Sequence, residues 1–220
     1  MKRIYFILCA LCVFALAPAQ NKKVETFDKN TWHWTEGSDK YQTVTIEDGF
    51  LLIHNHQKNK KATAYEQIAK SYAKLPLRPQ ENFKLTIKYF VADYNITWYW
   101  ILFNTNRKCL DEDADPTNLV ESYLFNQISS YWALNLGDGQ VHKGKIPGKV
   151  KQKGEYPMEF VLKKRSKLVT IELNGIQLYE GELQLTNPCI GFQVPLFNKK
   201  NSYIKIDEVI VEQADREEDD

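Results

Sequence analysis

The segment LVTIELNGIQLYE, residues 168–180, places Asn174-Gly175 between two stretches in which apolar and polar residues alternate. Alternation with a period of two is the pattern of a β-strand that has one buried and one exposed face. The two central residues of a type I′ turn need positive φ, and Asn-Gly between alternating stretches is the strongest short-range signal of a hairpin. The sequence therefore predicts two antiparallel strands that meet at Asn174-Gly175.

The same alternation recurs along the chain. In FKLTIKYFV, residues 83–91, the odd-numbered residues are apolar or aromatic, whereas Lys84, Thr86 and Lys88 occupy the opposite face. Further strands are expected at 43–47, 49–54, 122–128, 131–136, 158–164 and 168–173. Turn-forming residues separate the strands at Asp48-Gly49, Ser129-Ser130, Gly137-Asp138-Gly139 and the charged segment 163–167.

Two segments depart from simple alternation. Apolar residues from Tyr65 to Tyr72 fall at helical spacing, so helix and strand both remain open for residues 62–74. In SYIKIDEVIVE, residues 202–212, the apolar phase shifts in the middle of the stretch. Such a shift predicts a β-bulge at Asp207 and Glu208.

About ten short strands with tight turns and no recurrent helical pattern indicate an antiparallel β protein. At this length the expected fold is all-β, a two-sheet jelly-roll β-sandwich with antiparallel strands. We expect a single domain over residues 20–212. A disordered acidic tail is expected over 213–220, because ADREEDD offers no apolar content to bury.

The chain begins MKRIYFILCALCVFALAPAQ, in which two basic residues precede an apolar run and the small residues Ala17-Pro18-Ala19. This layout is typical of a cleavable secretory signal, and the apolar run is shorter than the about 20 residues of a membrane span. We expect a signal peptide at 1–19 and a mature chain without a membrane span that is secreted, periplasmic or held at the cell surface. A lipoprotein anchor at Cys9 or Cys12 is the alternative, but each follows Leu rather than a small residue.

The mature chain is near neutral and keeps two cysteines. Removal of residues 1–19 takes two of the 29 basic residues and none of the 28 acidic ones, which leaves 27 against 28, a net charge of −1. Such a chain lacks the global field that attracts nucleic acid or anionic lipid. Cys109 and Cys189 can pair as a disulfide in an oxidising compartment, and two separate buried thiols are the alternative.

Five stretches together resemble a known superfamily: FKLTIKYFV, WYWILFN, YLFNQISSYWALNL, VTIELNGIQLYEG and IGFQVPLFNKKNSYIKIDEVIV, in that order. Their order resembles the concanavalin A-like lectin/glucanase superfamily, and within it the LamG-like and DUF1080-like (3-keto-disaccharide hydrolase-like) jelly-roll domains of secreted Bacteroidetes-type proteins. The resemblance covers residues 25–212 and implies that Asn174, Gly175, Gly191 and Asp207 are structural. This sandwich carries lectins, glycosidases and adhesive modules, so the resemblance implies a fold more than an activity.

No catalytic pattern is present. Glycosidases of the related family 16 type share a strand with E-x-D-x-E or E-x-D-x-x-E, which places two carboxyl groups on one face about 5 to 5.5 Å apart. No stretch of this chain matches that pattern. Asp111, Asp113 and Asp115 alternate, but Pro116 follows them, so we expect a loop that either binds calcium or is simply solvated. We predict no catalytic or metal-binding residue, and no cofactor apart from this calcium alternative.

Aromatic residues are the remaining candidates, because sugars stack their C–H faces on Trp and Tyr. The predicted ligand-binding residues are Trp32, Trp34, Tyr99 and Trp132, and core packing is the alternative for each. In NITWYWILFN, residues 95–104, Trp98 and Trp100 share a large apolar face that we assign to the core between the sheets. This assignment places Tyr99 on the opposite face.

The predicted function is a secreted or periplasmic, non-catalytic glycan-binding module whose partner is a polysaccharide or oligosaccharide. Two alternatives remain open. One is a glycoside hydrolase with unrecognised carboxylates, so whether the chain is an enzyme is undecided. The other is a structural or protein-binding module at the cell surface.

Overall fold

The computed structural model describes residues 20–38, 42–55, 68–92, 99–104, 122–126, 131–135, 141–145, 155–195 and 202–214. In chain order the strands are β1 (Gln20–Glu25), β2 (Gly37–Ser38), β3 (Gln42–Glu47), β4 (Phe50–Asn55), β5 (Ile68–Lys74), β6 (Phe83–Ala92), β7 (Tyr99–Asn104), β8 (Ser122–Asn126), β9 (Tyr131–Asn135), β10 (Val141–Lys145), β11 (Glu155–Arg165), β12 (Leu168–Leu173), β13 (Ile176–Glu182), β14 (Cys189–Pro195) and β15 (Ser202–Ala214). These bounds contain the described part of every strand that the alternation predicts, except that β4 begins at Phe50 and not at Gly49.

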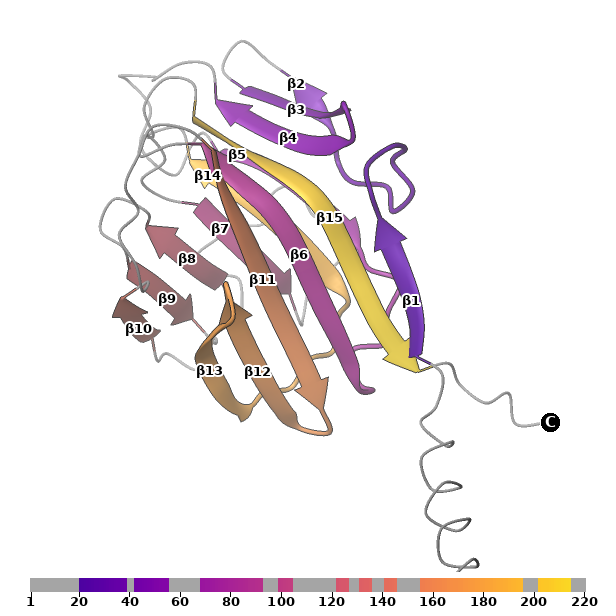
Figure 1. Cartoon of the computed structure of the whole chain (residues 1–220), viewed down its shortest axis with the longest axis vertical. Coiled ribbons are helices and arrows are strands. Elements are labelled where there is room, and N and C mark those ends of the chain that lie inside the picture. The colour runs from indigo at the N-terminus through magenta and orange to yellow at the C-terminus, as the bar shows by residue number, and fades with distance from the viewer. Residues whose placement is uncertain are drawn as a thin grey trace, which may run out of the picture.

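The strands form two antiparallel sheets. The large sheet has the order β13-β12-β11-β6-β15-β4-β3-β2, and β1 also pairs with β15. The small sheet has the order β10-β9-β8-β7-β14-β5. Figure 1 shows the sheets as two layers, with β11, β6 and β15 in front of β7, β8 and β14. This arrangement confirms the predicted all-β, two-sheet antiparallel sandwich.

Alternation decides which residues enter the core between the sheets. The odd-numbered residues of β6, from Phe83 to Val91, are all buried. The same core cluster takes these residues from the small sheet: Ile101, Phe103, Ile190, Phe192 and Val194. Burial of apolar surface contributes roughly 25 cal/mol per Å² and is the main stabilising term of such a core.

Two of the predicted turns and the predicted bulge are confirmed, whereas the turn predicted at 163–167 is shorter, because β11 continues to Arg165. Asn174 and Gly175 join β12 to β13 with φ angles of 48° and 75°, which is the combination that a type I′ turn requires. Asp48-Gly49 joins β3 to β4 with φ angles of 51° and 75°. On β15 the register with β6 shifts between Ile206 and Glu208, at the predicted bulge.

Residues 68–74 of the segment left open between helix and strand form β5. Pairing with β14 along the whole length of β5 satisfies its backbone and outweighs the helical spacing of its side chains. β15 runs to Ala214, two residues beyond the expected domain end at 212, because β1 pairs with it to that point. The leader 1–19, residues 62–67, the turns at 129–130 and 137–139 and the tail 215–220 lie outside the described residues. In the described part of the chain, no helix has the length and apolar character needed to cross a membrane.

The predicted phase of β7 is wrong. Tyr99 is 1% exposed and lies in the core between the sheets, whereas Trp100 is half-buried on the opposite face. Both faces of this strand are apolar, so alternation alone does not show which face is buried. Tyr99 can enter the core because its hydroxyl lies 3.1 Å from the hydroxyl of Tyr89, which satisfies its polar group there. Trp98, the other residue assigned to the core, lies outside the described residues.

Candidate functional site

The outer face of the small sheet carries a cluster of aromatic and amide side chains. Cross-strand register places Tyr72 of β5 beside Gly191 of β14, and Gly191 beside Leu102 of β7. In the next row, Gln193 of β14 is beside Trp100 of β7. Tyr72, Leu102 and Trp100 pack together as a cluster separate from the core between the sheets. We call these five residues the small-sheet cluster.

Tyr72 is held in place by its two neighbours on β14. A Cβ at position 191 would overlap Cδ1 and Cε1 of Tyr72, so the tyrosine ring crosses the strand where only glycine leaves room. The side-chain amide of Gln193 donates a hydrogen bond to the Tyr72 hydroxyl oxygen. Burial raises the pKa of Tyr72, and the hydrogen bond from Gln193 lowers it in part. The hydroxyl is therefore neutral at physiological pH and keeps a hydrogen to donate.

Gln193 is a buried side chain with an unused acceptor. It is 1% exposed, and its Oε1 has no hydrogen-bond partner among the described residues. A buried acceptor in this state costs about 1 to 3 kcal/mol, which a donor from a ligand would offset. Trp100, half-buried beside Gln193, supplies an indole surface. Stacking faces next to amide and hydroxyl groups are the chemistry that recognises sugars.

The strands of the small sheet contain no carboxylate. Neither Asp nor Glu occurs in the sequences of β5, β7, β8, β9, β10 and β14. Most glycoside hydrolases use two carboxyl groups, about 5 to 9.5 Å apart, on either side of the bond that they cleave. These strands supply neither carboxyl group of such a pair.

The four predicted ligand-binding residues do not form one surface. Trp34 is 2% exposed and stacks on Phe192 with ring centroids 5.6 Å apart. Trp32 and Trp132 are partly buried and pack against the same core as Trp34 and Tyr99. Tyr99 and Trp34 are therefore part of the core between the sheets and not of an outer face.

Sequence reasoning missed Tyr72, Trp100 and Gln193 as members of one site. A signal was present in β5, where Lys70, Tyr72 and Lys74 alternate with small residues, as in a strand with one exposed face. The helical spacing of the preceding residues obscured it. Nothing near Gln193 in the sequence indicates its partner, because Tyr72 lies more than a hundred residues away along the chain.

The disulfide and calcium predictions fall partly outside the described residues. Cys189 is disulfide-bonded, whereas Cys109 is not among the described residues, so its pairing with Cys189 stays a prediction. Asp111, Asp113 and Asp115 belong to the connection between β7 and β8, which is also not described. Within the described ranges, no three His, Cys, Asp or Glu side chains come together in a way that could hold a metal ion.

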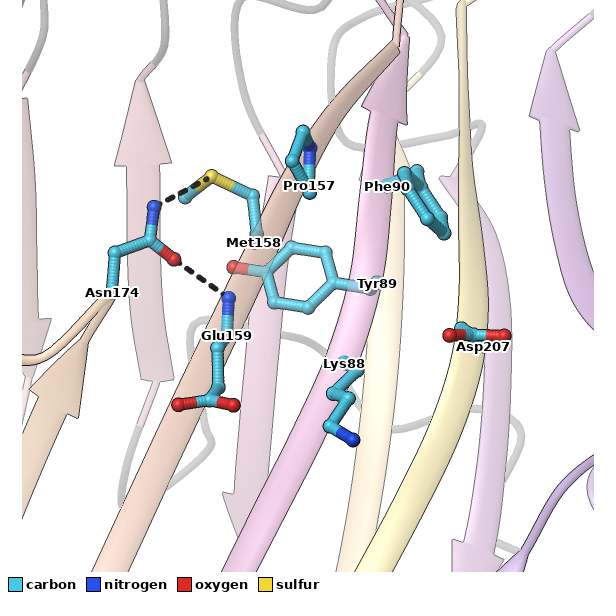
Figure 2. Close-up of a pocket in the computed structure, with 8 residues that line it drawn as sticks. All are labelled: Lys88, Tyr89, Phe90, Pro157, Met158, Glu159, Asn174 and Asp207. Atoms are coloured by element: carbon cyan, nitrogen blue, oxygen red, sulfur yellow. Dashed lines mark hydrogen bonds between the residues drawn. The ribbon is translucent and has the colours of Figure 1, made fainter.

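A hollow of about 280 Å³ lies on the other side of the molecule, on the outer face of the large sheet. It forms where β12 ends and β11 continues without that neighbour. Asn174, at the hairpin turn, bridges this gap, since its Oδ1 accepts a hydrogen bond of 2.7 Å from the backbone N–H of Glu159 (Figure 2). The hollow is lined by Lys88, Tyr89, Phe90, Pro157, Met158, Glu159, Asn174 and Asp207.

The charges around this hollow compensate one another. Figure 2 shows Glu159 and Asp207 on either side of Lys88. Lys88 donates a hydrogen bond of 2.6 Å to Glu208. That hydrogen bond raises the pKa of Lys88, burial lowers it in part, and the negative charges of Glu208, Glu159 and Asp207 raise it further. The carboxylates of Glu208, Glu159 and Asp207 thus stabilise the charged form of Lys88.

The two-sheet antiparallel sandwich, with its aromatic cluster on one outer face, is a jelly-roll β-sandwich, a fold that solved structures share. The catalytic domain of an endo-1,3-beta-glucanase (laminarinase) from Thermotoga petrophila RKU-1 matches with a TM-score of 0.58 and 14% identity, over 90% of this chain and 100% of that one. A Bacillus subtilis protein of unknown function with a galectin-like fold matches with a TM-score of 0.56 and 11% identity, over 87% of this chain and 97% of that one.

A sialidase matches with a TM-score of 0.54 and 13% identity over 83% of this chain, which spans only 17% of that protein. No family model and no curated protein sequence matches the chain. Identities this low establish the fold and leave the activity to be argued from the site.

Proposed function

We propose that this chain is a secreted glycan-binding module that acts without catalysis, and that the small-sheet cluster is its binding surface. One observation carries the proposal: this face combines Trp100, Tyr72 and Gln193 with strands that contain no Asp or Glu. The glucanase among the fold neighbours supports a polysaccharide or oligosaccharide as the partner. Secretion rests on the leader-like residues 1–19.

Each member of the cluster has a role in this proposal. The C–H face of a sugar ring stacks on the indole of Trp100. The Tyr72 hydroxyl donates a hydrogen bond to a sugar oxygen, and Oε1 of Gln193 accepts one from a sugar hydroxyl. Gly191 and the hydrogen bond from Gln193 fix the tyrosine ring before the ligand arrives, which lowers the entropic cost of binding.

Calorimetric titration of residues 20–220 with laminarin, mixed-linkage β-glucan, dextran, polygalacturonate and mucin tests the proposal. We expect Trp100→Ala to weaken binding of a recognised glycan by about three- to tenfold, since an aromatic contact of this kind contributes roughly 0.5 to 1.5 kcal/mol. Phe90→Ala is the matched control, because Phe90 is a half-buried aromatic residue on the outer face of the other sheet. Failure to bind any of these glycans, or an equal loss in both variants, refutes the proposal.

The hydrolase alternative is favoured by one observation, the match to a glucanase catalytic domain along its full length. Release of reducing ends from laminarin distinguishes the two functions, and we expect none. If sugar is released, Glu159→Gln and Asp207→Asn test whether the carboxylates beside Lys88 are responsible. Loss of activity in either variant would establish the chain as an enzyme.

A further inference from the structure

All the lysines in the strands of the small sheet lie on the same face as the small-sheet cluster. In β5, Lys70 and Lys74 flank Tyr72 at a spacing of two, so the three residues share a face. At the other edge of the sheet, Lys143 and Lys145 of β10 are both exposed. The sheet thus has cationic residues on its outer face at both edges.

A single row of cross-strand neighbours connects these two edges. From one edge to the other, the row runs through Lys70, Gln193, Trp100, Leu124, Ala133 and Lys143. Residues paired in this way in an antiparallel sheet point to the same side. Five strand spacings of about 4.8 Å make the row roughly 24 Å long. It begins and ends with a lysine, and the stacking and hydrogen-bonding groups lie between them.

None of the four lysines has a carboxylate partner among the described residues. On the outer face of the large sheet, by contrast, four lysines form ion pairs of 2.6 to 2.7 Å: Lys84–Glu212, Lys88–Glu208, Lys163–Glu172 and Lys205–Glu155. None of the ion pairs among the described residues includes a lysine of β5 or β10. The strands of the small sheet contain no Asp or Glu that could pair with them.

We infer that the glycan bound by the small sheet is anionic, a polysaccharide that carries carboxylate or sulfate groups. This inference rests on the proposed function. The lysines at the ends of the row bind the anionic groups, while Trp100 and Gln193 bind a sugar ring between them. A nucleic acid fits less well, because its phosphates repeat at every nucleotide whereas the middle of this row is uncharged. The chain as a whole carries a net charge of only +1, so the attraction is local to this face.

Dextran and dextran sulfate test the inference, because they share a backbone and differ in charge. Polygalacturonate supplies carboxylate groups in place of sulfate, and single-stranded DNA is a polyanion without pyranose rings. We expect the protein to bind dextran sulfate or polygalacturonate at least about tenfold more tightly than dextran at 0.15 M NaCl, and to lose most of that preference at 1 M, where the Debye length falls to about 3 Å.

Two double variants separate a local charge effect from a global one. Lys70→Gln/Lys74→Gln and Lys143→Gln/Lys145→Gln each remove two charges from the proposed face. We expect each to weaken binding of the acidic glycan by roughly three- to tenfold, as for two exposed ion pairs. Arg165→Gln/Lys167→Gln is the matched control, since it removes two exposed charges from the large sheet, one at the end of β11 and one in the turn that leads to β12. We expect this control to bind as the wild type does.

The outcomes distinguish this inference from the proposed function. Equal binding of dextran and dextran sulfate, lowered by Trp100→Ala, overturns the inference and leaves the proposed function standing. Equal losses in the lysine variants and in the Arg165/Lys167 control overturn the inference as well. Binding of DNA as tight as that of the acidic glycan shows nonspecific polyanion attraction and overturns it too. Binding to no glycan refutes the proposed function itself.

Discussion

Substitution of Gly191 by Ala tests how the small-sheet cluster is built. The added Cβ would lie closer to the Tyr72 ring than the 3.0 Å that real Cβ atoms keep, and the next atom it meets, the Ser71 backbone oxygen, stands at 3.4 Å. The ring therefore has to move. Tyr72 is only 8% exposed, so it has little room in which to do so without breaking its hydrogen bond with Gln193.

The magnitude follows from three contributions. Overpacking of a well-filled site costs about 1 to 3 kcal/mol, and loss of the hydrogen bond costs about 1 kcal/mol. Replacement of Gly by Ala within a strand returns roughly 0.5 to 1 kcal/mol through the backbone. We expect the free energy of unfolding of Gly191→Ala to fall by about 2 kcal/mol.

A double-mutant cycle with Tyr72→Ala isolates the contact. In the Tyr72→Ala background the ring is gone, so Gly191→Ala should be neutral or slightly stabilising, and the coupling energy should be about 2 kcal/mol. Urea unfolding of the four proteins, followed by tryptophan fluorescence, measures the free energies. Additivity within about 0.5 kcal/mol would refute the close packing of Tyr72 on Gly191.

Three further predictions concern the core and the hairpin. Tyr99→Phe should lower the free energy of unfolding by about 1 kcal/mol, because the Tyr89 hydroxyl loses its partner at 3.1 Å, and should leave glycan affinity unchanged in calorimetry; a fall in affinity would place Tyr99 at the ligand. Burial raises the pKa of both Tyr89 and Tyr99. Their contribution to stability is therefore complete below the unfolded pKa of about 10 and is lost as the pH rises above it. The midpoints of urea unfolding, measured between pH 8 and 11.5, should fall at the alkaline end, and they should fall less steeply in Tyr89→Phe/Tyr99→Phe. Asn174→Ala should lower thermal stability by about 1 to 2 kcal/mol, because Ala disfavours the φ of 48° and cannot accept the hydrogen bond from Glu159; Asn174→Gly keeps the turn and should lose less, and the same loss in both would show that φ is not limiting.

Local features of the fold were predictable because neighbouring residues decide them. Asn174-Gly175 provides both positive φ angles of the hairpin. The shift in the apolar alternation around Asp207 predicts the bulge on β15. The phase of β7 was not predictable in this way. Its residues are large and apolar on both faces, so they do not show which face is buried. Trp100 faces outward because its cross-strand neighbours, Gln193 on β14 and then Lys70 on β5, form the polar outer face of the sheet. Those strands lie far from β7 in the sequence.

The charge pattern shows the same limit. A net charge near zero indicates the absence of a global field, and this much the composition establishes. It does not reveal that, among the strands, acidic residues occur only in the large sheet. The lysines of β5 and β10 share a face only because four strands lie between them in the small sheet. The aromatic residues are likewise evident in the sequence, but the sequence does not show which of them are buried. Trp34 is buried because it packs on Phe192, and Tyr99 because it packs on Tyr89, and both partners are distant or on another strand.

The position of β15 has a consequence for how the chain folds. β15 separates β6 from β4 in the large sheet and also pairs with β1, yet it follows every strand with which it pairs. Until residues 202–214 leave the ribosome, the strands of the large sheet form three parts that do not pair with one another: β13-β12-β11-β6, β4-β3-β2 and β1. Pairs as distant as Gln20 and Ala214 must then form. Long-range pairing of this kind folds slowly. Late completion of the large sheet would suit the secretion that we propose, because a secretion channel accepts the polypeptide before it folds.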